Sequence, residues 1–273
     1  MNKEEQKNIE IALEDICSIV NTSFKKFTEL EEDNIKTILE WLIRIQLEDK
    51  KQKTLRVKRN TMKEYHKIKT IFERDMEGNK KLIEGKFRNP LVEYLKDNEW
   101  IFTEKVDGTN IRVFWDGHKV SFNGRTDNAQ IHGHLVEKLN ELFMGNVNEE
   151  MFEQKFGETS VILFGEGYGA GIQKGGGDYI DEKDFILFDV MVGDVFLERE
   201  SVEDIAKSFN IKCVPIAPVK TITEAVEYVK SKPLSQVGKC IKEIEGVVGT
   251  PKQRIFDFRG NRVIVKIKVE DFI

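Results

Sequence analysis

The most informative part of the chain is an eight-residue stretch, Thr103–Asn110, with the sequence Thr-Glu-Lys-Val-Asp-Gly-Thr-Asn. Strand-forming residues flank it, at Trp100–Glu104 and Asn110–Trp115, so Asp107-Gly108 is typical of a turn between strands. Lys105 lies beside that turn. A lysine amine is a nucleophile only when it is unprotonated, and burial or nearby cations lower its pKa. On its own, Lys-x-Asp-Gly is also typical of a surface turn with a solvated lysine, so its meaning depends on the rest of the chain.

The segments on either side of this stretch predict a mixture of strands and helices. Apolar runs bounded by turn residues predict strands at Lys119–Phe122, Val161–Gly165, Phe185–Val192, Glu245–Thr250 and Arg262–Val269. Helical spacing of apolar residues predicts helices at His134–Met144, Val202–Phe209 and Thr223–Lys230, the last of them beginning at Thr223. Strands and helices do not alternate strictly, which favours an α+β fold with antiparallel sheets flanked by helices.

The first 63 residues have a different pattern. Apolar residues recur at helical spacing from Lys3 to about Leu47, and they are followed by a basic run, Lys50–Lys69, that contains few acids. We therefore expect a helical N-terminal extension, residues 1–63, before a second domain, residues 64–273. The basic run is either a solvated helix face or a surface that follows nucleic-acid phosphates.

Composition excludes several classes of protein. The 273 residues are 40% hydrophobic and include 18 Phe, which is enough for a sizeable core and argues against wholesale disorder. No apolar run approaches 18 residues and the N-terminus is charged, so neither a membrane span nor a secretory signal is expected. The three cysteines, Cys17, Cys213 and Cys240, are scattered, which indicates a reducing, cytoplasmic location. The net charge of −5 means that any nucleic-acid contact must come from local patches.

Further motifs follow the Lys105 stretch in a fixed order. They are Gly124-Arg125-Thr126, which begins about 20 residues beyond the lysine, then Phe164–Gly167, Phe185–Val190, Glu245–Val248 and Val265–Lys268. Together with Glu104–Asn110, this series resembles the covalent nucleotidyltransferases, which comprise ATP-dependent DNA ligases, RNA ligases and mRNA capping enzymes. The form Glu-Lys-x-x-Gly-Thr-Asn is most similar to the bacteriophage RNA-ligase-2-like branch, and the resemblance covers roughly Tyr65 to Phe272.

The resemblance implies a nucleotidyltransferase (ligase adenylation) fold and a nucleophile. Lys105 attacks the α-phosphorus of ATP, forms a lysyl-AMP and releases pyrophosphate. Lys266 and Lys268 are alternate residues of one expected strand and therefore point to the same face, where they stabilise phosphate charge, unless they form an exposed stripe on an edge strand. Arg125 binds a phosphate through its planar guanidinium, the alternative being a surface ion pair.

The resemblance also assigns the remaining binding residues. Glu166 binds ribose hydroxyls, or is a turn acid in a glycine-rich stretch. Phe188 stacks on adenine, or belongs to the core. Glu104 helps to recognise the purine edge or orient the base, and Asn110 forms hydrogen bonds near the nucleophile or the phosphates. Glu245 holds Mg²⁺ or Mn²⁺, or forms a salt bridge at a strand end. Asp107 either caps the turn or contacts the site.

The expected activity is that of an ATP-dependent RNA ligase that seals a 5′-phosphate to a 3′-hydroxyl through an adenylylated 5′ end. The first alternative is a small ATP-dependent ligase of DNA or of nicks in RNA/DNA hybrids; the second is a non-catalytic nucleic-acid-binding adaptor. The expected partner is nucleic acid, as RNA ends or a nicked duplex, and the oligomeric state is left open. Because the chain ends soon after Lys268, no C-terminal OB domain is expected, and the extension is expected to share in holding RNA.

Overall fold

The structure is a computed structural model that describes Ile43 and residues 62–78, 81–239 and 241–273. Residues Met62–Ile273 cluster into one compact unit. The predicted helical extension lies outside the described residues, apart from Ile43, Met62 and Lys63, and so does the basic run as far as Arg59. Every helix within the described ranges is too short or too polar to cross a lipid bilayer.

The first sheet carries the strand that leads into Lys105. Its strands lie in the order β1 (Lys69–Thr70), β12 (Val265–Lys268), β11 (Gly246–Pro251) and β4 (Trp100–Glu104). All neighbours are antiparallel except β1 and β12. Along β4 Trp100 and Phe102 are buried, whereas Ile101 and Thr103 are partly exposed, as expected of a strand with one face on a core.

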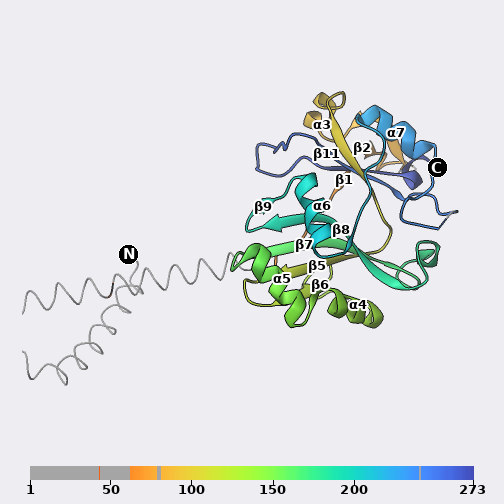
Figure 1. Ribbon diagram of the computed structural model, residues 1–273. Helices are drawn as coiled ribbons and strands as arrows, with labels where there is room; N and C mark the ends of the chain where they lie inside the picture. Colours follow the sequence, from red (N-terminus) through yellow and green to blue (C-terminus); the bar gives the residue numbers. More distant parts are fainter. Residues whose placement is uncertain (1–42, 44–61, 79–80, 240) are drawn as a thin grey trace, which may run out of the picture. The chain divides into compact units, whose positions relative to one another are not determined.

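One face of this sheet is covered by helices. Helix α7 (Ile222–Lys230) and the short α3 (Pro90–Tyr94) pack there with the hairpin of β2 (Phe72–Arg74) and β3 (Leu82–Phe87). The side chain of Thr221 accepts a hydrogen bond from the backbone N–H of Glu224 in a capping box, so α7 begins ahead of the predicted start at Thr223. Figure 1 shows α3 and α7 on the same side of β11.

The second sheet holds the strand that leaves Lys105. Its strands are β10 (Lys212–Cys213), β8 (Lys183–Val192), β7 (Val161–Gly169), β5 (Thr109–Trp115) and β6 (Val120–Asn123), with β9 (Val195–Phe196) beside β8. Only β10 pairs in parallel. Strand β7 is buried along nearly its whole length because both of its faces are covered.

Three helices cover the outer face of the second sheet. They are α4 (Gly133–Phe143), α5 (Asn146–Phe156) and α6 (Arg199–Ser208), and their apolar residues share one core with β5, β7 and β8. The opposite face packs Phe164 and Met191 against Tyr65, Phe188 and Phe196. Short 3-10 helices occur at Gly176–Asp178 and Val269–Phe272. The predicted α+β class with antiparallel sheets is therefore confirmed.

Several details differ from the sequence expectations, and two of them have a clear physical reason. Helix α5 was not predicted, because of its apolar residues only Phe152 is buried and Val147 is exposed, so no apolar stripe marks it. The last strand is shorter than the predicted Arg262–Val269, since regular pairing of β12 with β11 begins at Val265. Arg262 instead pairs with Phe256 in an isolated bridge.

Candidate active site

Lys105 lies on the turn that joins the two sheets. Strand β4 ends at Glu104 in the first sheet and β5 begins at Thr109 in the second, so the chain crosses between the sheets at Lys105–Gly108. The backbone N–H of Lys105 donates to the carbonyl of Gly246, over 2.9 Å, and that of Asp107 donates to the hydroxyl of Tyr179, over 3.2 Å. These bonds anchor the turn to β11 of the first sheet and to the segment between β7 and β8.

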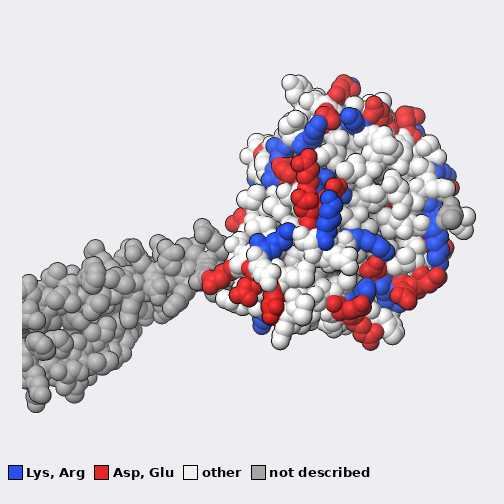
Figure 2. Space-filling view, viewed as in Figure 1, with Lys and Arg blue, Asp and Glu red and all other residues white. Residues whose placement is uncertain are grey.

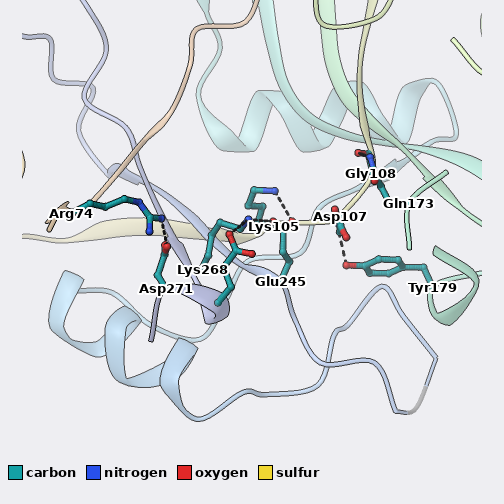
Figure 3. A network of polar contacts seen from close by, with 10 residues as sticks. Arg74, Lys105, Asp107, Gly108, Gln173, Tyr179, Glu245, Lys268 and Asp271 are labelled. Carbon is teal, nitrogen blue, oxygen red and sulfur yellow. Dashed lines mark hydrogen bonds and ion pairs between the residues drawn. The ribbon is translucent and has the colours of Figure 1, made fainter. Parts of the chain in front are cut away.

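Gly108 makes this crossing possible. A Cβ atom at this position would lie 2.2 Å from the carbonyl oxygen of Gly167 and 2.8 Å from Cγ of Glu166. The turn therefore packs directly on β7, and only glycine fits there. From the segment after β7, Gln173 donates a hydrogen bond to the Gly108 carbonyl, over 3.0 Å (Figure 3).

A single carboxylate connects two of the predicted lysines. Nζ of Lys105 is 2.5 Å from Oε2 of Glu245, and Nζ of Lys268 is 2.9 Å from Oε1 of the same side chain (Figure 3). Lys268 also pairs with Glu270, over 2.7 Å. Burial works to lower the pKa of Lys268, but its hydrogen bonds to Glu270 and Glu245 raise it. The structure thus gives Lys268 two carboxylate partners.

Lys266 lies on the same face of β12 as Lys268, as their alternation predicts. Val265 and Ile267 point into the core, and the two lysines point away from it. Burial lowers the pKa of Lys266, and the positive charges of Lys105 and Lys268 lower it further. An anion next to these three lysines is therefore favoured by the electrostatics of the site.

A cavity of about 280 Å³ opens beside Lys105. Its lining contains most of the predicted site residues: Glu104, Lys105, Asn110, Arg125, Glu166, Phe188 and Lys266. Glu245 and Lys268 are not among the lining residues. Glu245 is connected to the cavity by its ion pair with Lys105, and Lys268 by its ion pair with Glu245. The structure therefore brings all the predicted site residues together, from both sheets and from the segments that connect their strands.

Glu166 has an unusual protonation equilibrium. It lies on β7 opposite Asn110 of β5. Burial raises its pKa to about 8, and although Lys105 lowers it, the negative charges of Glu245 and Asp107 add to the increase. Near neutral pH this carboxyl group is largely protonated, so it can donate one hydrogen bond and accept another.

Two uncharged residues of the cavity are open to a ligand. The amide oxygen Oδ1 of Asn110 is buried and has no hydrogen-bond partner in the described part of the chain. Buried polar atoms are rarely left unpaired, so this atom is suited to a donor from a bound molecule. Phe188 packs edge-on against Tyr65, with ring centroids 5.1 Å apart, and also lines the cavity.

Glu104 is engaged by the protein itself. It is 5% exposed, and its carboxylate accepts hydrogen bonds from the hydroxyl of Ser235 and, over 2.9 Å, from the backbone N–H of Gln236. Both oxygens therefore hold the segment that leads towards Glu245. These bonds favour a positioning role over the purine contact expected for Glu104.

Arg125 and Arg112 lie in opposite surroundings, one exposed and one buried. Arg125 is exposed in the loop after β6, and its side chain makes no hydrogen bond or ion pair with the described residues. Arg112 is fully buried, and it donates to the carbonyls of Gly124 and Met62 and to Asp127. Arg112 thus holds the loop that carries Arg125, a role that no sequence motif indicated.

A second group of lining residues was also missed. Tyr65 donates to the carboxylate of Asp189, over 2.7 Å, and accepts from Nη2 of Arg262, over 2.6 Å. Arg262 also forms an ion pair with Asp189. Burial, followed by the charge of Asp189, raises the pKa of Tyr65 well above its usual range. Distant segments supply these three residues, so spacing in the sequence carries no signal for them.

These features define the class of protein. Two sheets joined at a half-buried lysine turn, with cations, a carboxyl and an aromatic ring around one cavity, are the arrangement that the resemblance to covalent nucleotidyltransferases of the ligase type predicts. An RNA ligase family model matches residues 98–268, which is more than half of the chain, so the chain belongs to the RNA ligase family. The predicted resemblance is confirmed.

Solved structures of the Naegleria gruberi RNA ligase have a similar fold. A mutant of that ligase with ATP and Mn gives a TM-score of 0.52 at 18% identity, over 67% of this chain and 52% of that one. Another mutant with ATP and Mn gives 0.55 at 17% identity, over 78% and 57%. The ligase with PPi gives 0.52 at 19% identity, over 77% and 60%. At these identities the similarity supports the shared fold, and the match spans little more than half of that ligase.

Proposed function

We propose that this chain is an ATP-dependent RNA ligase that joins a 5′-phosphate to a 3′-hydroxyl through a lysyl-AMP on Lys105. The observation that carries the proposal is the position of Lys105, whose amine is held by Glu245 at the edge of a cavity that also contains Lys266, Glu166 and Phe188. Membership of the RNA ligase family and the ATP and Mn in the Naegleria gruberi ligase support it.

In the first step the amine of Lys105 attacks the α-phosphorus of ATP. A P–N bond forms, the bond between the α-phosphorus and its bridging oxygen breaks, and pyrophosphate leaves. The amine loses a proton in this step, and Oε2 of Glu245 is an acceptor in contact with it. Lys266 and Lys268 stabilise the negative charge on the phosphates.

The nucleotide is held by the walls of the cavity. Phe188 stacks on the adenine, and the protonated carboxyl of Glu166 exchanges hydrogen bonds with the ribose hydroxyls. Asn110 accepts a hydrogen bond through its unpaired Oδ1. Arg125 has no partner within the described residues, so its guanidinium is available to a phosphate.

Two further transfers complete the reaction. A 5′-phosphate oxygen of RNA attacks the phosphorus of the lysyl-AMP, the P–N bond breaks, and the 5′ end carries AMP through a pyrophosphate link. The 3′-hydroxyl of the second end then attacks the 5′-phosphorus, forms the phosphodiester and releases AMP. The amine of Lys105 takes up a proton from solvent as it leaves, and the attacking 3′-hydroxyl gives its proton up to solvent in the last transfer.

Glu245 fits a hard divalent cation only as one of several ligands. In the described part of the chain no group of three or more His, Cys, Asp or Glu side chains is arranged to hold a metal ion. A carboxylate oxygen shared with phosphate and water oxygens suits Mg²⁺ or Mn²⁺. When bound, such an ion neutralises charge on the transferred phosphate.

The proposal extends to the organisation of the chain. In it, residues 64–273 act as the adenylation domain, and the basic end of residues 1–63 contacts RNA. The scattered cysteines support a cytoplasmic location.

Intact-mass spectrometry after incubation with ATP and Mg²⁺ or Mn²⁺ tests the nucleophile. We expect an AMP adduct on the unaltered chain, none on Lys105→Ala, and an unchanged adduct on Lys207→Ala, a control at an exposed lysine of α6. An adduct that persists in Lys105→Ala contradicts the assignment. No adduct on the unaltered chain favours the non-catalytic adaptor.

Sealing assays identify the substrate. We expect the chain to join RNA strands that have 5′-phosphate and 3′-hydroxyl ends. Matched strands whose 3′-hydroxyl end is a deoxyribose should be joined less efficiently. Equal or better sealing of the deoxyribose ends favours the DNA or hybrid nick ligase instead.

A further inference from the structure

A tightly built hairpin connects β11 to β12. Phe256 and Arg262 pair across it in an antiparallel bridge. At its tip the carboxylate of Asp257 accepts from the backbone N–H groups of Arg259, over 2.9 Å, and Asn261, over 2.8 Å. Gly260 has a φ of +76°, which closes the turn without strain. The tip residues are therefore held in a fixed conformation.

This hairpin presents an aromatic residue to solvent. Phe258 is 92% exposed and the neighbouring Phe256 is 52% exposed. The guanidinium of Arg259 lies 5.1 Å from the centroid of the Phe258 ring. A phenylalanine displayed in this way gains nothing from burial in the described fold.

The base of the hairpin is part of the cavity that holds Lys105. Arg254, Ile255 and Arg262 all line that cavity. Arg254 pairs with Glu198, over 3.0 Å, and the guanidinium of Arg262 lies 4.0 Å from the ring centroid of Phe196 in β9. Figure 1 shows the connection between β11 and β12 as a blue loop that projects from the domain on the side of β9. The hairpin therefore connects the wall of the cavity to its exposed tip.

We propose that the tip of this hairpin binds an unpaired nucleotide next to the RNA end that is joined, with its base stacked on Phe258 and its backbone phosphate beside Arg259. The inference rests on the proposed function, which supplies RNA as the ligand of the cavity. An aromatic ring with an adjacent arginine on a rigid element is the chemistry by which proteins hold single-stranded bases.

The charge of the surface supports a local contact of this kind. Figure 2 shows lysine and arginine side chains interspersed with acids on the displayed face, with no broad field of one sign. Without such a field, affinity for single-stranded RNA depends on individual stacking and ion-pair sites.

The test measures binding of a 5′-phosphorylated, single-stranded RNA to the full chain by fluorescence anisotropy at fixed salt, without ATP. We expect Phe258→Ala to weaken binding about 5- to 100-fold, the effect of losing one stacked base. Phe258→Trp retains the affinity. The matched control is Tyr94→Ala on α3, an aromatic that is 82% exposed and does not line the cavity, and it leaves the affinity unchanged.

A second measurement identifies the base. RNAs with one abasic position are scanned from the 5′ end and from the 3′ end. We expect one position near an end at which the abasic RNA weakens binding to the unaltered chain but not to Phe258→Ala. Equal loss in both proteins at every position overturns the inference, as does unchanged binding by Phe258→Ala.

The inference and the proposed function fail in different assays. Formation of the AMP adduct on Lys105 requires no RNA, so Phe258→Ala is expected to form it normally. A normal adduct with unchanged RNA affinity overturns the hairpin contact alone. Lack of an adduct on the unaltered chain overturns the proposed chemistry, while the binding assay still decides the role of Phe258.

Discussion

At the scale of single residues, protonation of Glu166 distinguishes this site from an ordinary carboxylate pocket. The side chain lies in the cavity near two other acids, Glu245 and Asp107, and only Lys105 and the backbone N–H of Gly108 favour its charged form. The group therefore keeps its proton at a pH where most glutamates have lost it. A protonated carboxyl is compatible with ribose hydroxyls, which both donate and accept hydrogen bonds.

Glu166→Gln tests this protonation state. Because the pKa is about 8 in the folded protein and ordinary, near 4.5, in the unfolded chain, the folded state binds more protons between these values. The stability that the proton contributes is complete below pH 4.5 and is lost as the pH rises through 8. We expect the free energy of unfolding of the unaltered chain to fall relative to Glu166→Gln by roughly 2–4 kcal/mol between about pH 5 and pH 8.5.

Urea unfolding of both proteins at the two pH values provides the measurement. The difference in unfolding free energy between the two proteins removes the contribution of groups that titrate in both of them. Asp107, whose pKa is also raised, is one of these groups. Parallel pH profiles for the two proteins contradict a raised pKa at Glu166.

At the scale of elements, the loop after β6 depends on an arginine that never meets the ligand. Arg112 donates hydrogen bonds to Gly124, Met62 and Asp127, and the bonds that Asp127 receives from Arg112 and Asn123 lower its pKa. The loop that these bonds hold carries Arg125, which lines the cavity. A buried arginine in β5 therefore positions an exposed one.

The two arginines should respond differently to the same substitution. Arg112→Met leaves two carbonyl groups without a donor and leaves Asp127 with only its bond from Asn123, so we expect a loss of about 2–4 kcal/mol in the free energy of unfolding. Arg125→Met should stay within about 0.5 kcal/mol of the unaltered chain, because its side chain is exposed and unpaired among the described residues. Both substitutions should slow formation of the AMP adduct. Urea unfolding and intact-mass time courses measure these effects, and equal stability of the two variants contradicts the supporting role of Arg112.

The elements also show which parts of the fold were predictable from sequence. Strand β4, whose apolar residues alternate clearly, has the predicted bounds, because one of its faces must be buried; the other predicted strands were located but their ends differ by one to four residues. Helix α5 was missed because it buries only Phe152, and the start of α7 was misplaced because Thr221 and Thr223 are both acceptable caps in sequence terms. Local sequence patterns show which face of a helix or strand is buried, but they do not show which tertiary contacts hold the element in place.

The same limit applies to the site. The motifs indicated that Lys105, Glu245 and Lys268 lie close together, since each has a characteristic neighbouring sequence, and their ion pairs agree with this. The Tyr65, Asp189 and Arg262 group was not predicted: Asp189 lies in the Phe185–Val190 motif, but nothing in the sequence shows that Tyr65 and Arg262, from distant segments, meet it in the folded chain. The partners of Glu104 were hidden for the same reason.

At the scale of the whole molecule, charge is distributed unevenly along the chain. The overall net charge is −5, yet Lys50–Lys69 contains nine lysines and arginines and one acid, Glu64. Nucleic acid is attracted by local positive charge, and the release of counterions makes that attraction depend on salt. The basic run is therefore the part of the sequence best suited to bind the RNA backbone.

Reversal of charge in this run tests its contribution. In the test variant of the full chain, Glu replaces Lys51, Lys53, Arg56 and Lys58. We expect this variant to bind RNA more weakly and with a flatter dependence on salt. The slope of log K against log salt should decrease by about 0.7 for each phosphate of a single strand that the variant no longer binds. The control carries the same change in net charge at Lys119, Lys138, Lys155 and Lys207, which do not line the cavity. Fluorescence anisotropy over a salt series measures both slopes. Equal slopes in the two variants mean that only net charge matters, and an unchanged slope in the first removes the basic run from RNA binding.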